Sequence, residues 1–322
     1  MINGKTNGHQ VPVFHYSWQL EQGSTVGIAL HAATRRLKGS DIDTPKLDSE
    51  LLLGHVLRWT RAQLYTHMER PLSDDEREAF EHLVERRLNY EPVAYLVGEK
   101  AFYGLDLFVD HRVLIPRPET ELLVDLALDI IMQADRLAAS ATNGNGRNAG
   151  HREPSVSVAD VGTGSGAVTL AIAANTRAAI VCGIDISADA LAVARANAQR
   201  HHLTDRVQFL QGDLLEPLDR QVDVVVANLP YVAQHEWSAL APDIAQYEPS
   251  LALSGGADGL GLIRRLVEQA PGKLRPGGMM LMEIGATQGA EVAALARQVF
   301  PDAFVEIVTD YAYNDRIVRV QT

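Results

Sequence analysis

The sequence lacks the features that mark secreted and membrane proteins. It has a single cysteine, Cys182, so no internal disulfide can form, and this usage fits a reducing cytoplasm. No apolar run approaches the roughly 20 residues that span a bilayer. Residues 1–20 mix glycine, histidine, glutamine and proline without the apolar stretch of a signal peptide. We therefore expect a soluble cytoplasmic protein that makes no membrane contact.

Basic residues are also scarce. The chain has 29 Lys and Arg against 41 Asp and Glu, which gives a net charge of −12. A broad nucleic-acid surface needs an excess of basic side chains. The charge therefore argues against direct nucleic-acid binding, although it does not exclude a local basic patch.

The composition is that of a globular protein with a sizeable core, since 46% of residues are hydrophobic and 22% are charged. A length of 322 residues favours about two domains. Shifts in composition divide the chain into a flexible lead-in (1–20), a small helical bundle (21–92), a β-hairpin linker (93–115) and an α/β domain (116–322) that carries a flexible loop insertion (138–157).

The first 90 or so residues show only helical patterns. Apolar residues recur at helical spacing over 24–37 and 45–57, and 60–67 is a short helix candidate. Ser73 with Glu76 forms a capping box that opens a helix running to about Leu88. The bundle carries no catalytic constellation. Its histidines are scattered, and we expect no metal site there: His55, His67 and His82.

After Pro92, β-branched and aromatic residues over 93–97 and 101–109 surround Gly98 and Gly104, which predicts a hairpin. Residues 122–137 form the next predicted helix. Strands and helices then alternate, which predicts a doubly wound, mainly parallel sheet. The predicted strands are 156–161, 179–184, 207–210, 222–226, 278–284, 304–309 and 316–320, and the predicted helices are 167–175, 187–201, 259–274 and 286–299.

The stretch Val222–Tyr231 organises the domain, because a buried strand leads directly into Asn228, Leu229, Pro230 and Tyr231. In an open α/β sheet, ligands bind beyond the carboxyl ends of the strands. A side-chain amide at this place can accept hydrogen bonds from an NH2 group, and the tyrosine ring offers a flat surface. An ordinary strand-to-loop turn is the alternative, since asparagine and proline are common turn residues.

A glycine-rich loop lies between the first predicted strand and helix of the α/β domain, with the sequence Gly162-Thr163-Gly164-Ser165-Gly166. Glycines let a backbone approach a ligand closely. Asp185 ends the next strand, where a carboxylate can accept from two ribose hydroxyls, and Asp213 follows the third. We expect Asp213 to accept from an adenine amino group. The loop also fits a dinucleotide fingerprint, and Asp185 could be a strand-end cap.

In this order, the glycine loop, Asp185, Asp213 and Asn228–Tyr231 resemble class I S-adenosylmethionine-dependent methyltransferases. More closely, the chain resembles the HemK/PrmC family of release-factor glutamine N5-methyltransferases over about residues 24–320. The most specific segments are Lys46–Leu53, Glu91–Gly98, Val113–Glu121, Glu248–Gly256 and Asp258-Gly259.

The resemblance implies a Rossmann-like doubly wound sheet that methylates the glutamine of a Gly-Gly-Gln motif in class I peptide chain release factors. It implies S-adenosyl-L-methionine as cofactor. A further hypothesis is that the helical bundle recognises the protein substrate, because it lacks a catalytic constellation and carries charged faces that include Arg58, Arg61, Arg86 and Arg87. The implied catalytic residues are Asn228, Leu229, Pro230 and Tyr231. The expected cofactor residues are Gly162, Thr163, Gly164, Ser165, Gly166, Asp185, Asp213, Leu214, Asn228, Glu119 and Thr120.

The sequence departs from the family pattern at Leu229, where the family usually has proline. Two other functions fit parts of the pattern. A nucleic-acid methyltransferase acting on adenine N6 or guanine N2 uses a similar tetrapeptide, although the net charge of −12 argues against it. A non-catalytic nucleotide-binding protein would keep the glycine loop and Asp185 but would need no Asn228 and Tyr231.

Overall fold

The computed structural model describes residues 18–40, 42–142 and 156–322. The flexible lead-in expected over 1–20 and the loop expected over 138–157 therefore fall largely outside the described residues. Where the loop is described, its first residues continue a helix to Thr142 and its last residues begin a strand at Val156. No helix in these described ranges is both long enough and apolar enough to cross a bilayer.

The chain divides into two compact units, Met1–Leu96 and Val97–Thr322. The first contains four packed helices, as the periodicity predicts: α1 (Val26–Lys38), α2 (Pro45–Leu57), α3 (Arg61–Thr66) and α4 (Asp74–Leu88). The Ser73–Glu76 capping box is present at the start of α4. A buried ion pair joins α4 to α2, with Arg87 Nε 2.7 Å from Asp48 Oδ2.

Residues 93–97 form a short helix, α5 (Val93–Val97), so the prediction of a strand there is wrong. The Pro92 carbonyl accepts from the backbone N–H groups of Tyr95 and Leu96, which closes one helical turn. Five apolar residues in a row do not by themselves distinguish a strand from a buried helical turn. Gly98 ends the turn with a φ of +74°.

The β-hairpin lies immediately after this helix, between β1 (Glu99–Phe102) and β2 (Leu105–Phe108). Tyr103 and Gly104 connect the strands with φ angles of 48° and 78°. Two positive φ angles in a two-residue connection match the twist of a hairpin, which explains why glycine stands at the second position.

The second unit is a seven-stranded sheet in the order β5-β4-β3-β6-β7-β9-β8. Strands β3 to β7 are parallel, and β9 and β8 close one edge in antiparallel pairs. The strands are β3 (Val156–Val161), β4 (Ala179–Asp185), β5 (Val207–Gln211), β6 (Val222–Ala227), β7 (Leu274–Glu283), β8 (Phe304–Thr309) and β9 (Asp315–Gln321).

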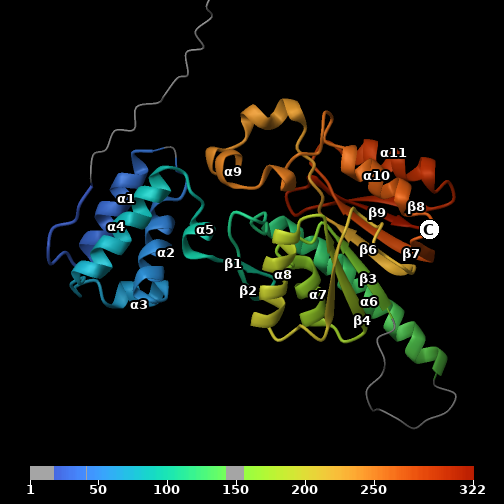
Figure 1. Cartoon of the computed structure of the whole chain (residues 1–322), viewed down its shortest axis with the longest axis horizontal. Helices are drawn as coiled ribbons and strands as arrows, with labels where there is room; N and C mark the ends of the chain where they lie inside the picture. Colours follow the sequence, from blue (N-terminus) through green and yellow to red (C-terminus); the bar gives the residue numbers. More distant parts are fainter. Residues whose placement is uncertain (1–17, 41, 143–155) are drawn as a thin grey trace, which may run out of the picture. The chain divides into compact units, whose positions relative to one another are not determined.

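Helices cover both faces of this sheet (Figure 1). Val224 and Val226 of β6 belong to the core formed with α6 and α7, whereas Val225 and Ala227 belong to the core formed with α10 and α11. This explains why β6 is almost entirely apolar. The helices are α6 (Glu121–Thr142), α7 (Ala167–Asn175), α8 (Ala188–Arg200), α9 (Pro242–Tyr247), α10 (Gly261–Gln269) and α11 (Gly289–Val299), with 3₁₀ turns η1 (Pro118–Thr120), η2 (Gln234–Ala239) and η3 (Ser250–Ala252).

Two predicted helices are too long. The helix predicted over 259–274 ends at Gln269, because Gly272 turns the chain with a φ of +88° and Leu274 already begins β7. The helix predicted over 286–299 begins at Gly289, because the Gln288 side chain accepts from the Gly285 N–H and closes a turn before it.

The strand register brings the predicted site residues to one edge. Val161 pairs with both Ile184 and Ala227, so β3, β4 and β6 end at the same level. The order of the strands reverses between β3 and β6, which is the switch point where open α/β sheets bind ligands.

Candidate active site

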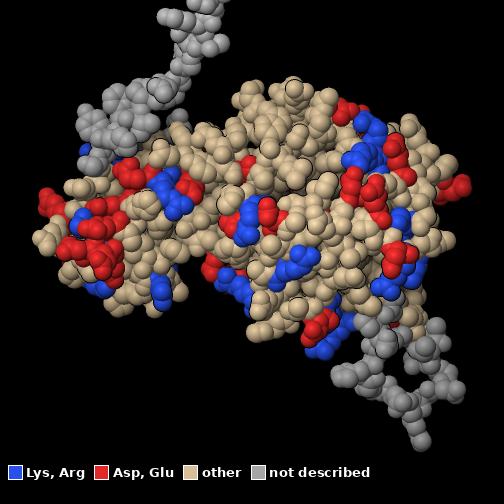
Figure 2. Space-filling view, viewed as in Figure 1, with Lys and Arg blue, Asp and Glu red and all other residues tan. Residues whose placement is uncertain are grey.

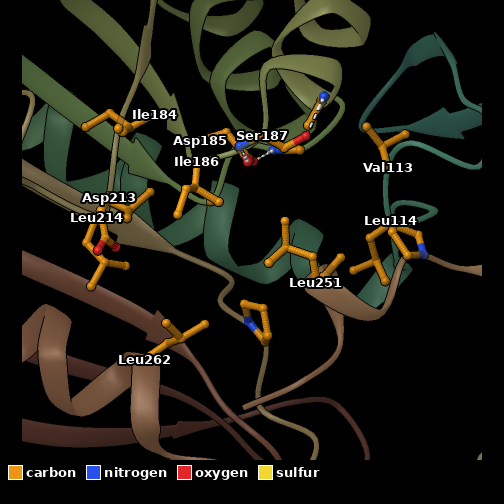
Figure 3. A pocket seen from close by; sticks show the side chains of 18 of the residues that line it. Val113, Leu114, Ile184, Asp185, Ile186, Ser187, Asp213, Leu214, Leu251 and Leu262 are labelled. Atoms are coloured by element: carbon orange, nitrogen blue, oxygen red, sulfur yellow. Dashed lines mark hydrogen bonds between the residues drawn. The ribbon is translucent and has the colours of Figure 1, made fainter. Parts of the chain in front are cut away.

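A cavity of about 360 Å³ lies at this edge of the sheet. Its volume falls within the range of small-molecule sites. Figure 3 shows Asp185, Leu214, Leu251 and Leu262 surrounding the same space from different segments. The lining is drawn from the loops after β3, β4, β5 and β6, from residues 112–114, from η3 and from the first turns of α10. We call this space the strand-end cavity.

The glycine loop forms one wall of the strand-end cavity, with Gly162 and Gly164 in its lining. Both have positive φ angles, 75° and 55°, which glycine adopts without strain. A Cβ atom at Gly162 would lie 3.0 Å from Cδ2 of Leu229, so a side chain there would disturb the tetrapeptide Asn228–Tyr231. Gly166 instead makes room for packing against α8, where Ala194 is its neighbour.

Asp160, near the end of β3, fixes the glycine loop to the start of α7 through hydrogen bonds. Its carboxylate accepts from the Thr163 hydroxyl at 2.7 Å and from the backbone N–H and hydroxyl of Thr169 at 3.1 and 2.7 Å. Burial raises the pKa of Asp160 to about 6, and the two threonine hydroxyls oppose this shift. Thr163 and Ser165 are buried, and neither lines the strand-end cavity.

Asp185 is held in place by backbone donors on two sides. Its Oδ2 accepts from the Gly164 N–H and its Oδ1 from the Ser187 N–H, both at 2.9 Å. Burial raises the pKa of this carboxyl, and the backbone hydrogen bonds lower it. A carboxylate has about four lone-pair positions, so Asp185 keeps acceptor capacity toward the strand-end cavity.

Asp213 and Leu214 line the cavity after β5, as does Arg265 of α10. The Asp213 carboxylate forms an ion pair with Arg265, which ties the loop to the helix. Arg265 was not among the residues that the sequence singled out. Leu214 has a φ of 52°, so the chain turns sharply here, and its apolar side chain is buried beside the cavity.

The tetrapeptide Asn228–Tyr231 is anchored from several directions. Asn228 Nδ2 donates to Thr120 Oγ1 at 3.0 Å. The Leu229 side chain is 4% exposed and belongs to the core, and Pro230 lines the strand-end cavity. The Tyr231 carbonyl accepts from Nε2 of Gln288 at 3.1 Å. Burial raises the pKa of Tyr231, and the nearby Glu283 raises it further.

A buried carboxyl connects the segment before α6 to the loop before η3. Glu248 accepts from the backbone N–H of Ile115 at 3.2 Å and forms an ion pair with Arg117. Burial raises its pKa and Arg117 lowers it. This ion pair gives a structural role to Arg117 and Glu248, which lie in two of the family-specific segments, Val113–Glu121 and Glu248–Gly256. Glu119, which the sequence suggested as a lip over the cofactor, is exposed and does not appear in the lining of the cavity.

Comparisons with known proteins agree with this architecture. The sequence patterns of the PrmC N-terminal domain and of a methyltransferase domain match residues 29–98 and 158–247. A release factor glutamine methyltransferase of Chlorobaculum tepidum is 41% identical over 280 residues, which cover 85% of this chain and 90% of that protein. One of Rhodopirellula baltica is 38% identical over 89% and 92% of the two chains. The chain belongs to the release factor glutamine methyltransferase family.

A solved protein-(glutamine-N5) methyltransferase from Alicyclobacillus acidocaldarius is 26% identical, with a TM-score of 0.37, and the match covers 64% of this chain and 93% of that one. The predicted fold class, a class I methyltransferase with a helical N-terminal part, is confirmed by the methyltransferase match, the sheet and the helices. The alternative of a non-catalytic nucleotide-binding protein is not favoured, because the relatives are enzymes.

The methyl donor of this family is S-adenosylmethionine, and the residues of the strand-end cavity fit it. Gly162 and Gly164 leave room beside the backbone, and Asp185 can accept from a pair of hydroxyls. The remaining walls are largely apolar, as a flat purine requires. These apolar side chains were not predicted from the sequence and come mainly from Val113, Leu114, Ile184, Ile186, Leu251 and Leu262.

The structure thus groups most of the predicted residues into three sets. Six line the strand-end cavity: Gly162, Gly164, Asp185, Asp213, Leu214 and Pro230. Three belong to the glycine loop but pack away from the cavity: Thr163, Ser165 and Gly166. Asn228 and Thr120 are hydrogen-bonded to one another beside the cavity.

Proposed function

We propose that this protein transfers the methyl group of S-adenosylmethionine to the side-chain amide nitrogen of the glutamine in the Gly-Gly-Gln motif of class I peptide chain release factors. The observation that supports this most directly is the tetrapeptide Asn228–Tyr231 next to a cavity that fits the cofactor, in a chain of the release factor glutamine methyltransferase family. Its residues match the chemistry that an amide substrate demands.

An amide nitrogen is a weak nucleophile, because its lone pair is delocalised into the carbonyl group. When bound, S-adenosylmethionine supplies an electrophilic methyl group on a positively charged sulfur. The task of the protein is therefore to orient the substrate nitrogen and to stabilise the positive charge that develops on it. Acceptor oxygens aimed at the two N–H bonds of the substrate amide would do both.

The tetrapeptide offers two such acceptors. Asn228 uses its Nδ2 for Thr120, so its Oδ1 is turned the other way. Among the described residues, no protein group donates to Oδ1 of Asn228 or to the carbonyl of Leu229. Both oxygens are thus available to one N–H each of the substrate glutamine. The Leu229 carbonyl is present whatever the side chain, so the replacement of proline at this position leaves the acceptor in place.

Pro230 and Tyr231 complete the proposed site. Pro230 restricts the conformation of Leu229, and the Gln288 contact fixes the backbone of Tyr231. We infer that the Tyr231 ring packs on the plane of the substrate amide and excludes water from it. The tetrapeptide holds no side chain suited to act as a general base, so we infer that the proton leaves after methyl transfer.

We also propose that the helical unit (Met1–Leu96) recognises the release factor and takes no part in the chemistry. Three of the four arginines that the sequence drew attention to are engaged within the unit: Arg61 with Glu50, Arg86 with Glu91 and Arg87 with Asp48. The fourth, Arg58, is exposed. Other exposed charges of this unit include Arg35, Lys38 and Lys46, and Asp74 and Asp75 at the start of α4, so charged recognition could use either sign.

We expect no direct role for nucleic acid. On the face shown in Figure 2, Lys and Arg side chains of the second unit are interspersed with Asp and Glu. Two arginines of the second unit have acidic partners, Arg264 with Asp258 and Arg275 with Asp223. A protein that modifies release factors would work in the cytoplasm, where the factors act.

The test is to incubate the enzyme with labelled S-adenosylmethionine and, separately, a class I release factor, DNA or RNA. The proposal predicts label in the release factor alone. Label in DNA or RNA, with none in the factor, would favour the nucleic-acid methyltransferase instead.

A further inference from the structure

One buried carboxyl beside the tetrapeptide has no role in the site described so far. Glu283 is the last residue of β7 and is 2% exposed. Because Met282 pairs with Ala227, the register brings Glu283 beside Asn228. Its Oε2 is buried and, within the described residues, has no hydrogen-bond partner. Buried polar atoms without hydrogen-bond partners are rare because they lower the stability of the fold, so a carboxyl that is kept in this position suggests a function.

A polar path leads from Asn228 toward this carboxyl. Asn228 Nδ2 donates to Thr120 Oγ1 at 3.0 Å, and Thr120 is close enough to Glu283 to lower the pKa of its carboxyl. An amide NH2 group can only donate, so the threonine oxygen is the acceptor in this bond. Its single proton is then free to turn toward the Glu283 carboxylate, which can accept it.

We propose that Thr120 and Glu283 are positioning residues that fix the amide of Asn228 so that its oxygen faces the substrate nitrogen. This inference rests on the proposed function. The two ends of a side-chain amide are nearly the same size, so packing alone does not decide which way the group points. In the flipped orientation, the NH2 group of Asn228 would face the NH2 group of the substrate. Two donors would then meet where the reaction needs an acceptor.

The direction of hydrogen bonding along this path depends on the charge of Glu283. An ionised carboxylate can only accept, whereas a protonated one can donate to Thr120 and so turn the threonine proton away. Burial raises the pKa of Glu283 to about 7. The polar and charged groups that face it are Thr120, Glu119, Arg117, Arg316 and Tyr231. The hydroxyl of Thr120 and the two arginines lower its pKa, and Glu119 raises it. The Thr120 proton is therefore held in a single direction only while the carboxyl is ionised, and Glu283 loses this form as the pH falls through its pKa of about 7.

The experiment measures kcat and KM of the full-length enzyme with a purified class I release factor, from about pH 5.5 to about pH 9. For the wild type we expect kcat to fall as the pH drops through about 7. Glu283→Gln removes the ionisation, so we expect a kcat about tenfold lower that no longer changes in this range. KM for S-adenosylmethionine should stay unchanged, because Glu283 does not line the strand-end cavity.

Thr120→Val interrupts the path and should lower kcat by about as much as Glu283→Gln, whereas Thr120→Ser keeps the hydroxyl and should restore it. The double variant Thr120→Val with Glu283→Gln should have a kcat no lower than that of either single variant, because both substitutions interrupt the same path. Glu306→Gln serves as the matched control, because Glu306 is exposed and lies on β8 of the same sheet. If circular dichroism shows that Glu283→Gln does not fold, the comparison of Thr120→Val with Thr120→Ser tests the inference by itself.

Three results would overturn the inference: a Glu283→Gln enzyme with wild-type kcat and pH profile, a Thr120→Val enzyme with wild-type kcat, or no rescue by Thr120→Ser. A wild-type enzyme that is inactive on release factors is a different failure, because it contradicts the proposed function itself.

Discussion

Asp185→Ala tests how the cofactor is held. The substitution removes a carboxylate that already accepts backbone hydrogen bonds from Gly164 and Ser187 at 2.9 Å. Its remaining lone pairs face the strand-end cavity, where a ribose would donate to them. A hydrogen bond to a charged group contributes roughly 1.5–3 kcal/mol, so losing one such bond weakens binding by about 10- to 150-fold. Losing two such bonds, roughly 3–6 kcal/mol together, would weaken binding by about 150-fold or more.

Calorimetric titration of the full-length enzyme with S-adenosylmethionine measures this effect. Asp205→Ala is the matched control, because Asp205 is exposed and lies just before β5, away from the cavity lining. A melting curve shows whether the variant folds, since Asp185 also braces the glycine loop against α8. Unchanged affinity in a folded Asp185→Ala enzyme, or tight binding of NAD by the wild type, would refute the cofactor assignment.

Three further predictions follow from the packing and the charges. Leu229→Pro should change kcat/KM by no more than about tenfold, because the backbone carbonyl of residue 229 stays in place. The same variant should be about 2 kcal/mol less stable in urea unfolding, because a buried leucine side chain is lost. Removing the helical unit, Met1–Leu96, should spare S-adenosylmethionine binding and abolish methylation of the intact release factor, whereas normal methylation by the folded remainder would contradict its role. Folding raises the pKa of Glu283 from 4.5 to about 7, so between these pH values the native state binds more protons than the unfolded state, and the free energy of unfolding falls as the pH rises. Over this pH interval the wild type should lose about 3 kcal/mol of stability relative to Glu283→Gln. Melting curves of the two proteins at several pH values would show the difference.

The elements that form the floor of the site could be predicted from the sequence. Short apolar runs that end at glycine, aspartate or asparagine located β3, β4 and β6, because strands buried on both faces leave that pattern. Once a parallel sheet was expected, Gly162, Asp185 and Asn228 had to meet at one edge. The register confirms this, since the three strands end together.

The far wall of the cavity could not be predicted in this way. Leu251, Leu262 and Arg265 come from segments that reach the cavity only through tertiary packing, and nothing local in the sequence marks them. Glu283 reads as the polar end of a strand, and only the pairing of β7 with β6 shows that it lies beside Asn228. The helix at Val93–Val97 was missed because a single helical turn is too short to show a period.

The structure also changes how Leu229 is understood. In the sequence, Leu229 stands out only as a departure from the proline that is usual in the family. Its side chain is buried against Gly162, and a Cβ at that glycine would approach it to 3.0 Å. The residue therefore helps to set the distance between the glycine loop and the tetrapeptide, which proline in the same place would do less fully.

The central claim is that Asn228 aims a glutamine nitrogen of a release factor at the methyl donor. Mass spectrometry of the factor after incubation with the enzyme and S-adenosylmethionine tests it most directly. The account predicts one methyl group on the glutamine of the Gly-Gly-Gln motif, formed about 10²- to 10³-fold more slowly by Asn228→Ala. A methyl group on another residue, or an Asn228→Ala enzyme as fast as the wild type, would contradict it.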